Sequence, residues 1–304
     1  MNDRPTIAVI HLLRAVYGVE PFRDFIESYK AHRAGIAHEL VLLCKGFVGS
    51  ELPPLWRDAL GATSASPVFV PDTGMDISSY FDLAETLDHR YLCFVNSWSR
   101  ILDDDWLAKL HHHVSAPGVG LAGATGAWFS LYTANVIYFR QQAEQRMATA
   151  GDESQFDMMR PYFPPFPNPY VRSNGFIIER SLFSSLRGTG ETKIEALMFE
   201  MGADGMTRQV RARGLKALVV GRDGRAYEPE AWPASRTFRS GDQENLLVAD
   251  KRTEMYASAE GMERESLAWS TWGSAATGEL PTSMGDLVPL EQAPIPPGRK
   301  MALG

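Results

Sequence analysis

A short polar segment directly after an apolar run carries side chains suited to binding a charged ligand. Residues 91–95 (YLCFV) form an apolar run rich in aromatic and β-branched residues, which predicts a buried strand. The run stops at a polar loop made of Asn96, Ser97, Trp98, Ser99 and Arg100. Amide, hydroxyl and guanidinium groups donate hydrogen bonds, and a guanidinium also neutralises negative charge. We therefore expect this loop to lie at the working edge of the protein.

Three consecutive carboxylates follow the loop. Asp103, Asp104 and Asp105 precede apolar residues at helical spacing over 106–114, so one of them is expected to cap a helix. A further strand is predicted at 118–124. In a strand, loop, helix and strand unit, the ligand lies outside the carboxyl ends of the parallel strands. This places residues 96–100 and 123–128 along one crevice.

The elements before this unit predict an α/β sheet that positions the loop. Apolar runs predict earlier strands at 6–13, 39–45 and 66–70. Helices are predicted at 21–34, 52–60 and 77–87, the last capped by Asp76. Strands that alternate with helices are typical of parallel βαβ units. The predicted fold class is therefore α/β with a mostly parallel sheet.

The pattern is less regular after residue 128. A helix at 129–149 and five prolines within 161–169 predict an insertion or lid at 129–169. Later predicted elements are a strand at 170–179 interrupted at 173–175, helices at 192–199, 206–213, 245–257 and 262–272, and a last strand at 215–221. The expected organisation is a domain at 1–225, a helical or irregular C-terminal extension at 226–273 and a flexible tail at 274–304.

Charge and apolar pattern exclude several classes of protein. The 304 residues carry a net charge of -7 with a pI of about 5.6, which argues against nucleic-acid binding. No apolar stretch approaches a transmembrane span, and the N-terminus lacks a signal-peptide pattern. Cys44 and Cys93 lie in apolar runs and are expected to be reduced core thiols. We expect a cytoplasmic protein, with peripheral attachment to the inner face of the membrane left open.

Several features together resemble one enzyme family. They are the order of elements, an aspartate after the third strand, the polar loop after the fourth, and a Gly-Ala-Asp segment opening a late helix that ends in Arg-Ala-Arg-Gly. Over residues 7–221 the chain resembles glycosyltransferases of the type A fold (GT-A, Rossmann-like), especially the family 2-type bacterial enzymes of polysaccharide biosynthesis. The resemblance implies a nucleotide-sugar donor as substrate and a cell-surface or lipid-linked glycan as acceptor.

The resemblance also implies which residues bind the donor. In such enzymes the loop after the first strand and the aspartate after the third hold the nucleoside, and the matching residues are His11, Arg14, Asp72 and Asp76. The family's Asp-x-Asp motif binds the diphosphate through a divalent metal, and here it falls on Asn96, Ser97 and Trp98. Mg²⁺ and Mn²⁺ prefer carboxylate oxygens, which these residues lack. No metal ligand is assigned, and dependence on a divalent metal is left open.

Without a metal, other groups must stabilise the charge that develops on the leaving diphosphate. Arginines or backbone amides can do so. The loop residues Asn96, Ser97, Trp98 and Ser99 are expected to contact the donor, and the candidates for stabilising the charge are Arg100, Arg172, Arg236 and Arg239. The last two lie in a polar segment after the last predicted strand, which is expected to fold back over the donor.

The catalytic base of the family is a carboxylate that takes the proton of the acceptor hydroxyl. Its position falls on Asp204, with Glu200 four residues earlier as a second candidate. A cap of the following helix is an equal alternative for Asp204. The candidates for the sugar or acceptor pocket are Thr125, Gly126, Trp128 and Asn174. For Trp128, core packing is an equal alternative.

These expectations lead to a hypothesis of function. The chain is expected to be an inverting glycosyltransferase that moves a sugar from a nucleotide-sugar donor to a glycan, with metal-independent catalysis as one option. The alternative is a non-catalytic sugar-nucleotide or glycan-binding protein with the same fold, because fold alone does not establish function. Nucleotidyl transfer would need a metal-binding carboxylate pair that the sequence does not offer. An oligomer formed through the C-terminal extension is also left open.

Overall fold

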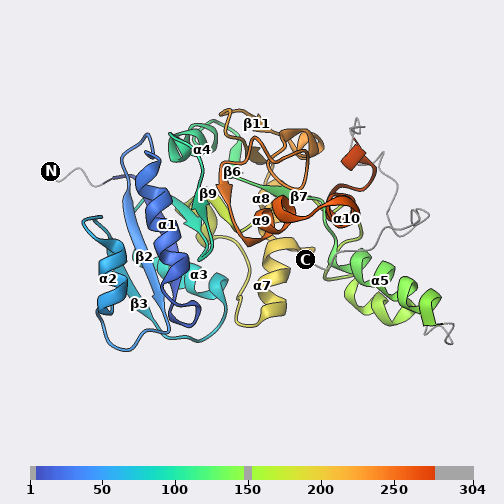
Figure 1. Cartoon of the computed structure of the whole chain (residues 1–304), viewed down its shortest axis with the longest axis horizontal. Helices are drawn as coiled ribbons and strands as arrows, with labels where there is room; N and C mark the ends of the chain where they lie inside the picture. Colours follow the sequence, from blue (N-terminus) through green and yellow to red (C-terminus); the bar gives the residue numbers. More distant parts are fainter. Residues whose placement is uncertain (1–4, 147–152, 278–304) are drawn as a thin grey trace.

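An eight-stranded sheet forms the centre of the computed structural model, which describes residues 5–146 and 153–277 (Figure 1). The strand order is β11-β10-β6-β9-β4-β1-β2-β3. These strands are β1 (Ile7–Arg14), β2 (Glu39–Lys45), β3 (Ser66–Val70), β4 (Tyr91–Val95), β6 (Val119–Gly123), β9 (Gly175–Glu179), β10 (Lys216–Val220) and β11 (Ala226–Tyr227). All pairs are parallel except those of β9 with β4 and β6 and of β11 with β10. The predicted α/β class with a mostly parallel sheet is confirmed.

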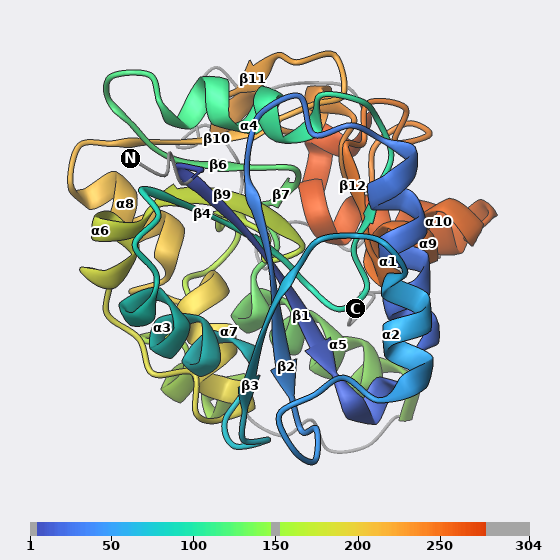
Figure 2. The same cartoon turned by 90° about the vertical axis from the view of Figure 1, so that its left-hand side faces the viewer.

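Helices cover both faces of this sheet (Figure 2). One face is covered by α1 (Glu20–Ala31), α2 (Pro54–Leu60) and α4 (Trp106–Val114). The other face is covered by α3 (Asp76–Thr86), α5 (Leu131–Arg146), α6 (Arg180–Ser184), α7 (Lys193–Met201) and α8 (Met206–Ala212). The remaining elements are the strands β5 (Arg100–Ile101), β7 (Gly126–Ala127), β8 (Tyr170–Val171) and β12 (Val248–Ala249), the helices α9 (Lys251–Ser258) and α10 (Gly261–Trp272), and 3₁₀ turns at Ala15–Tyr17, Glu153–Met159, Pro229–Ala231, Pro233–Ser235 and Gly273–Thr277.

The first strand shows how the two faces are separated. Successive side chains of a strand point to opposite faces. Ala8 and Ile10 of β1 belong to the core beside α3 and α7, whereas Val9 belongs to the core beside α1 and α2. His11 follows the odd-numbered register, and its ring stacks on Phe25 with a centroid separation of 3.7 Å. The alternation therefore turns His11 into the core under α1.

Several predicted strand boundaries match the structure, because strands of a mostly parallel sheet consist largely of apolar residues. The predictions 39–45, 66–70 and 91–95 agree with β2, β3 and β4. The predicted helix at 245–257 is wrong in its first half, because Val248 and Ala249 form β12 and pair antiparallel with β5. The segment 215–221 is also not the last strand, since β11 and β12 follow it. The predicted elements at 147–149 and 278–304 lie outside the described residues.

Three predicted helix caps are also corrected. Asp105 occupies the N-cap position of α4 with a φ of 58°, but its carboxylate accepts from the Arg33 side chain instead of the helix. Asp76 is the first residue of α3, which leaves Met75 at the N-cap. Gly205, and not Asp204, is the N-cap of α8. Side-chain caps need extended backbone before the first turn, and these aspartates do not occupy such a position.

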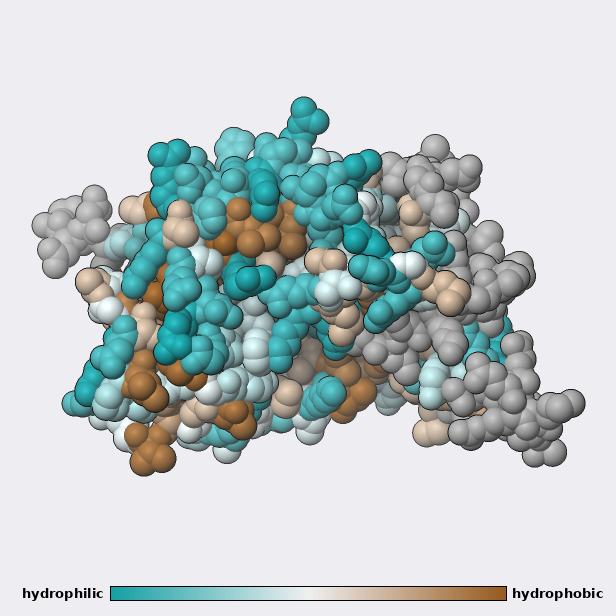
Figure 3. Space-filling view, in the orientation of Figure 1, coloured by the Kyte–Doolittle hydropathy of each residue, from teal (hydrophilic) through white to brown (hydrophobic). Residues whose placement is uncertain are grey.

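The C-terminal extension packs against the predicted main domain. The indole of Trp272 in α10 contacts that of Trp128 at a centroid separation of 5.4 Å, and both are fully buried in the core that includes α3 and α7. The surface seen in Figure 3 is mainly hydrophilic, with hydrophobic residues in small separate groups. Within the described residues, the helices are all too short or too polar to span a bilayer.

Candidate functional site

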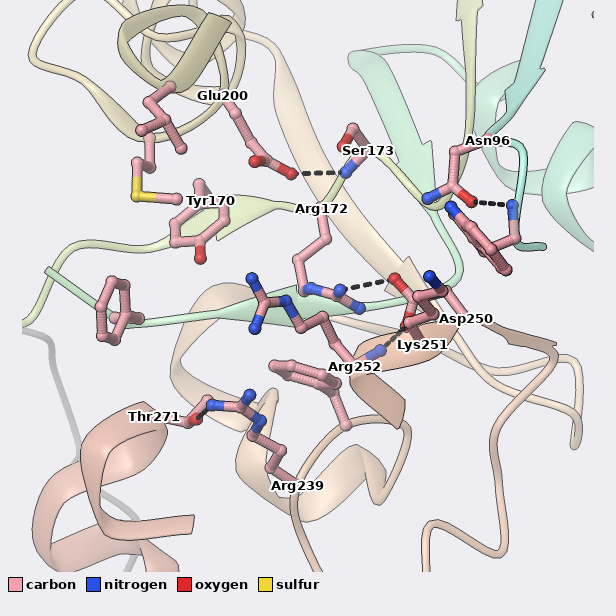
Figure 4. A pocket seen from close by; sticks show the side chains of 15 residues that line it. Asn96, Tyr170, Arg172, Ser173, Glu200, Arg239, Asp250, Lys251, Arg252 and Thr271 are labelled. Atoms are coloured by element: carbon pink, nitrogen blue, oxygen red, sulfur yellow. Dashed lines mark hydrogen bonds and ion pairs between the residues drawn. The ribbon is translucent and has the colours of Figure 1, made fainter. Parts of the chain in front are cut away.

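A hollow of about 300 Å³ lies beyond the carboxyl end of β4 (Figure 4). The antiparallel β9 begins beside this end, since Gly175 pairs with Val95. The sequence order of the strands reverses at the neighbouring β1, which pairs with β2 on one side and β4 on the other, and such switch points are where ligands bind in open α/β sheets. The lining residues are Asn96, Trp98, Phe129, Tyr170, Arg172, Ser173, Leu197, Glu200, Met201, Phe238, Arg239, Asp250, Lys251, Arg252 and Thr271.

The side-chain oxygens of the loop after β4 form hydrogen bonds within the loop and to neighbouring segments of the protein. The side-chain oxygen of Asn96 accepts from the Trp98 backbone N–H at 2.9 Å. The buried hydroxyl of Ser97 donates to the Leu12 carbonyl at 2.8 Å, and that of Ser99 donates to the Asn174 carbonyl at 2.6 Å. Asn96 and the indole of Trp98 are the parts of this loop that line the hollow.

This loop does not fit a Mg²⁺ or Mn²⁺ ion. Both ions take oxygen ligands, preferably carboxylates. The oxygens of Asn96 and Ser97 are engaged within the protein, and an indole has no oxygen. Over residues 5–146 and 153–277, no group of three or more His, Cys, Asp or Glu side chains converges as a metal site. Asp103 pairs with Lys109 and Asp105 with Arg33, away from the residues that line the hollow.

A lysine from the far end of the chain covers the Trp98 indole. The ammonium nitrogen of Lys251 lies 3.1 Å from the centroid of the Trp98 ring, a cation–π contact. The other neighbour of the indole is Tyr17, at a centroid separation of 5.3 Å. Lys251 is the first residue of α9, and the antiparallel pairing of β12 with β5 brings this helix to the loop. The structure therefore places a positive charge over the loop after β4.

A buried ion pair anchors the centre of the hollow. Arg172, which is 8% exposed, donates to Asp250 at 2.6 Å, and its guanidinium carbon lies 4.0 Å from the centroid of the Phe238 ring. Burial disfavours the charge of Arg172, but Asp250 keeps the pKa of Arg172 above its ordinary value. The second oxygen of Asp250 caps α9 by accepting from the Arg252 and Thr253 backbone N–H groups. One carboxylate thus fixes both Arg172 and the start of α9.

Thr125 and Asn174, predicted to line an acceptor pocket, lie behind this ion pair. The Thr125 hydroxyl accepts from Arg172 at 3.2 Å and donates to the side chain of Asn174. The Asn174 amide in turn donates to the Val248 carbonyl of β12 at 3.0 Å. Both residues are almost completely buried and do not line the hollow. Thr125 and Asn174 therefore hold Arg172 and β12 in position through these hydrogen bonds.

The two predicted bases lie in different surroundings. Glu200, near the end of α7, lines the hollow and accepts from the Ser173 backbone N–H at 2.8 Å. Burial raises the pKa of Glu200, and the nearby Arg172 opposes this rise. Asp204 is exposed and borders a separate hollow with Tyr162 and Arg187. Of the two, only Glu200 lines the same hollow as the basic side chains.

Two predicted arginines lie in the hollow and two lie outside it. Arg172 and Arg239 line it, and Arg239 is 4% exposed. Arg100 pairs with Glu254, and Arg236 pairs with Glu244 on the exposed rim of another hollow. Those pairs satisfy the charges of Arg100 and Arg236 at the surface.

Of the residues predicted to bind the nucleoside, some lie near the surface and others are buried. Arg14 at the end of β1 forms an ion pair with Asp72 beyond β3 at 2.8 Å, near the surface. His11 is fully buried, burial lowers its pKa to about 3, and neither ring nitrogen has a partner among the described residues. Asp76 accepts from the Ile77 backbone N–H at 3.0 Å, and burial raises the pKa of Asp76. His11 does not reach the surface that Arg14 and Asp72 share.

Gly126 and Trp128 are also placed in the core. The Trp128 indole N–H donates to the Pro229 carbonyl at 2.9 Å, and the side chain is fully buried. A Cβ atom at Gly126 would lie 2.6 Å from the ring of Trp232. Gly126 therefore allows the close approach of the C-terminal extension, and the core alternative for Trp128 describes its position.

The structure adds charged residues that the sequence analysis did not select. These are Asp250, Lys251 and Arg252, which fall in the segment 245–257 that was predicted as a helix throughout. A local signal was present, because an aspartate followed three residues later by a threonine matches a helix N-cap. The missing information was the pairing of β12 with β5, which depends on contacts distant in sequence.

Comparisons with known proteins are limited to solved structures, because no protein-family model and no curated protein matches the chain. The chain is similar to glucosyl-3-phosphoglycerate synthase from Mycobacterium tuberculosis in complex with Mn²⁺, UDP and glucosyl-3-phosphoglycerate, at 15% identity and a TM-score of 0.36, over 64% of this chain and 63% of that one. It is also similar to a mannosyltransferase from Pyrobaculum calidifontis in complex with GDP-Man and Mn²⁺, at 10% identity and a TM-score of 0.41, over 78% of this chain and 61% of that one. The chain spans less than two thirds of either protein. At these scores the similarities do not define an activity, so the functional conclusion depends on the site.

Proposed function

We propose that the chain is a glycosyltransferase that moves a sugar from a nucleotide-sugar donor to an acceptor hydroxyl. The observation that carries this proposal is a hollow at the switch point of the sheet that the carboxylate of Glu200 lines together with several cationic side chains. Transfer of a sugar from a diphosphate needs both kinds of group. A base takes the proton of the acceptor hydroxyl, and positive charge stabilises the departing diphosphate.

Lys251 supplies the positive charge at the loop after β4 in this proposal. Its ammonium lies over Trp98, in the segment that matches the Asp-x-Asp motif of the family that the chain resembles. Since the donor set of Asn96, Ser97 and Trp98 does not fit a divalent metal, no step is assigned to one. A lysine is a compact charge that binds phosphate oxygens in other nucleotide sites.

Glu200 is the proposed base. Its carboxylate takes the proton as the acceptor oxygen forms a bond to the anomeric carbon. The bond between that carbon and the diphosphate oxygen breaks, and its electron pair leaves with the diphosphate. A single displacement of this kind inverts the anomeric configuration. The raised pKa of Glu200 suits this role because a base works best when its pKa approaches the working pH.

The finer expectations belong to the same proposal. The acceptor is a hydroxyl of a cell-surface or lipid-linked glycan, and transfer takes place in the cytoplasm or at the inner face of the membrane. The alternative, a protein that binds sugar nucleotides without transferring the sugar, shares the hollow and differs in the outcome of a turnover assay.

Donor binding and turnover test the proposal together. We expect one of the UDP-, GDP-, CMP- or dTDP-linked sugars to raise the Tm of the full chain equally in EDTA and in Mn²⁺. Lys251→Met should weaken this binding about ten- to hundredfold, and Lys251→Arg should retain part of it. A Tm shift that appears only with Mn²⁺ would contradict the proposal that Lys251 binds the diphosphate without a metal. Donor binding without release of nucleoside diphosphate in the presence of glycan acceptors would favour the binding-only alternative.

A further inference from the structure

A second basic group lies in the same hollow, on the other side of Arg172 from Asn96 (Figure 4). It consists of Arg239 and Arg252. Arg239 is buried, its Nε–H has no partner among the described residues, and its Nη1 reaches only the Thr271 hydroxyl at 3.4 Å. No hydrogen bond or ion pair joins the Arg252 guanidinium to another residue in the part of the chain that the structure describes.

Arg239 contrasts with Arg172, the other buried arginine of the hollow. Arg172 has Asp250 as a carboxylate partner, whereas Arg239 has none among the described residues. Burial, together with the nearby charge of Arg172, lowers the pKa of Arg239 to about 10. Buried charges in folded proteins are normally paired. An unpaired buried guanidinium that lines a hollow is thus a site for an anion.

The backbone around Arg239 holds it in this costly position. Arg239 and Gln243 have φ values of 45° and 52°, in the left-handed region that side chains rarely adopt. The Gln243 side chain accepts from the Arg239 N–H at 3.0 Å and donates to the Thr253 carbonyl of α9 at 2.9 Å. This link fixes the Arg239 loop to the helix that carries Arg252. Strain of this kind persists where the surroundings enforce it, often at ligand sites.

The position of Arg239 and Arg252 in the hollow favours a role in binding the acceptor over a role in binding the donor. Asn96 and Trp98 mark the end of the hollow where the donor diphosphate is proposed to lie. Arg252 and Arg239 lie on the side of the hollow where Tyr170 and Thr271 lie, whereas the Glu200 carboxylate points toward Ser173 (Figure 4). Burial and the nearby Glu200 raise the pKa of Tyr170, and Arg172, Arg239 and Arg252 oppose this rise, so the phenol of Tyr170 lies near all four charges.

We infer that Arg239 and Arg252 bind an anionic group, a carboxylate or a phosphate, on the acceptor whose hydroxyl Glu200 deprotonates. This inference rests on the proposed glycosyl transfer and narrows its acceptor class. The acceptor is a hydroxyl compound with a negative charge close to the reacting oxygen, such as an acidic or phosphate-linked sugar. A guanidinium fork matches either anion in two-point geometry.

Three small probes that share a hydroxyl-bearing skeleton test the inference in the full chain. They are glycerol, D-glycerate and glycerol 3-phosphate, with binding followed by calorimetry and Tm. We expect binding of at least one of the two anions and none of glycerol. Arg239→Gln and Arg252→Gln should each weaken anion binding about ten- to hundredfold while leaving nucleoside diphosphate binding unchanged. Arg225→Gln, an exposed arginine remote from the hollow, is the matched control and should bind both ligands normally.

The outcomes separate this inference from the proposed function. Equal binding of glycerol and the anions, or no anion binding, would overturn the inference. Loss of nucleoside diphosphate binding in Arg239→Gln would also overturn it, because Arg239 would then belong to the donor site. If the wild-type chain binds the anions but no nucleotide or nucleotide sugar, the anion site stands and glycosyl transfer fails. Because Arg239→Gln removes an unpaired buried charge, its Tm without ligand should not fall, so that a loss of binding is not due to unfolding.

Discussion

The helices α4 and α9 both begin behind an acidic residue, Asp105 and Asp250. Asp105 belongs to a run of three carboxylates, is partly exposed, and pairs with Arg33 at 3.1 Å. Asp250 stands alone in its segment and is buried, where it caps α9 and pairs with Arg172. The acidic run of residues 103–105 therefore forms ion pairs at the surface, whereas the single Asp250 holds Arg172 and the start of α9 in place at the hollow. Burial and shared partners, more than the local density of charge, distinguish the acidic residue that shapes a site.

The largest expected effect concerns the two acidic residues near the end of α7. Glu200→Gln should lower the rate of sugar transfer about 10²- to 10⁴-fold, because the proposed base is lost. Asp204→Asn, the matched control at an exposed position, should remain within a few-fold of wild type. The measurement is release of nucleoside diphosphate under saturating donor, with binding checked by Tm. If Asp204→Asn lost activity and Glu200→Gln kept it, the base would be Asp204. Burial would then not distinguish the acidic residue that serves the site.

A smaller effect is expected when the two helix starts are changed in the same way. Asp250→Asn keeps a capping side chain but leaves Arg172 buried without its charge partner, at a cost on the order of 3 kcal/mol in the free energy of unfolding. Asp105→Asn changes an exposed pair and should cost less than about 1 kcal/mol. Urea unfolding of both variants provides the values. Similar losses in the two proteins would show that burial does not distinguish these aspartates.

The smallest expected effect concerns the pH at which activity is lost on the acid side of the pH profile. A base is active when it is deprotonated, so activity falls as the pH drops through its pKa. Because burial raises the pKa of Glu200, this fall should occur at a higher pH than for an ordinary glutamate, whose pKa is about 4.3. The profile of kcat/KM from pH 4 to 8 measures it, since this ratio reports the free enzyme. An acid limb at or below the ordinary value would argue against a buried base.

Much of the fold could be predicted from the sequence, because its elements are local patterns. The runs at 39–45, 66–70 and 91–95 are mainly apolar and match β2, β3 and β4. The amphipathic spacing of 21–34 likewise matches α1 except at its ends. The same patterns indicated that a polar loop follows β4. Glu200, chosen for its distance from the family's base position, and Arg172, chosen as a cation for the leaving diphosphate, both lie in the hollow.

The composition of the site could not be predicted to the same extent. The polar loop after β4 was expected to present its own side chains, but Ser97 and Ser99 turn inward to backbone carbonyls. The family resemblance assigned His11 to the loop after the first strand, although the predicted strand at 6–13 contains it, and β1 extends through Arg14 and carries His11 into the core. A side chain at the end of a strand can bind a ligand or pack inside according to where that strand ends, and a small error in the boundary reverses the outcome.

The sequence by itself determined the parallel βαβ order, the strand cores and the absence of an Asp-x-Asp pair from the loop directly after β4. Only the tertiary structure decided that β9 lies antiparallel between β4 and β6 and that β12 pairs with β5. Those pairings bring Lys251, Arg252 and Arg239 to a loop more than a hundred residues earlier. Strand pairing over such separations depends on the whole core that surrounds it, so it leaves no periodicity in the local sequence.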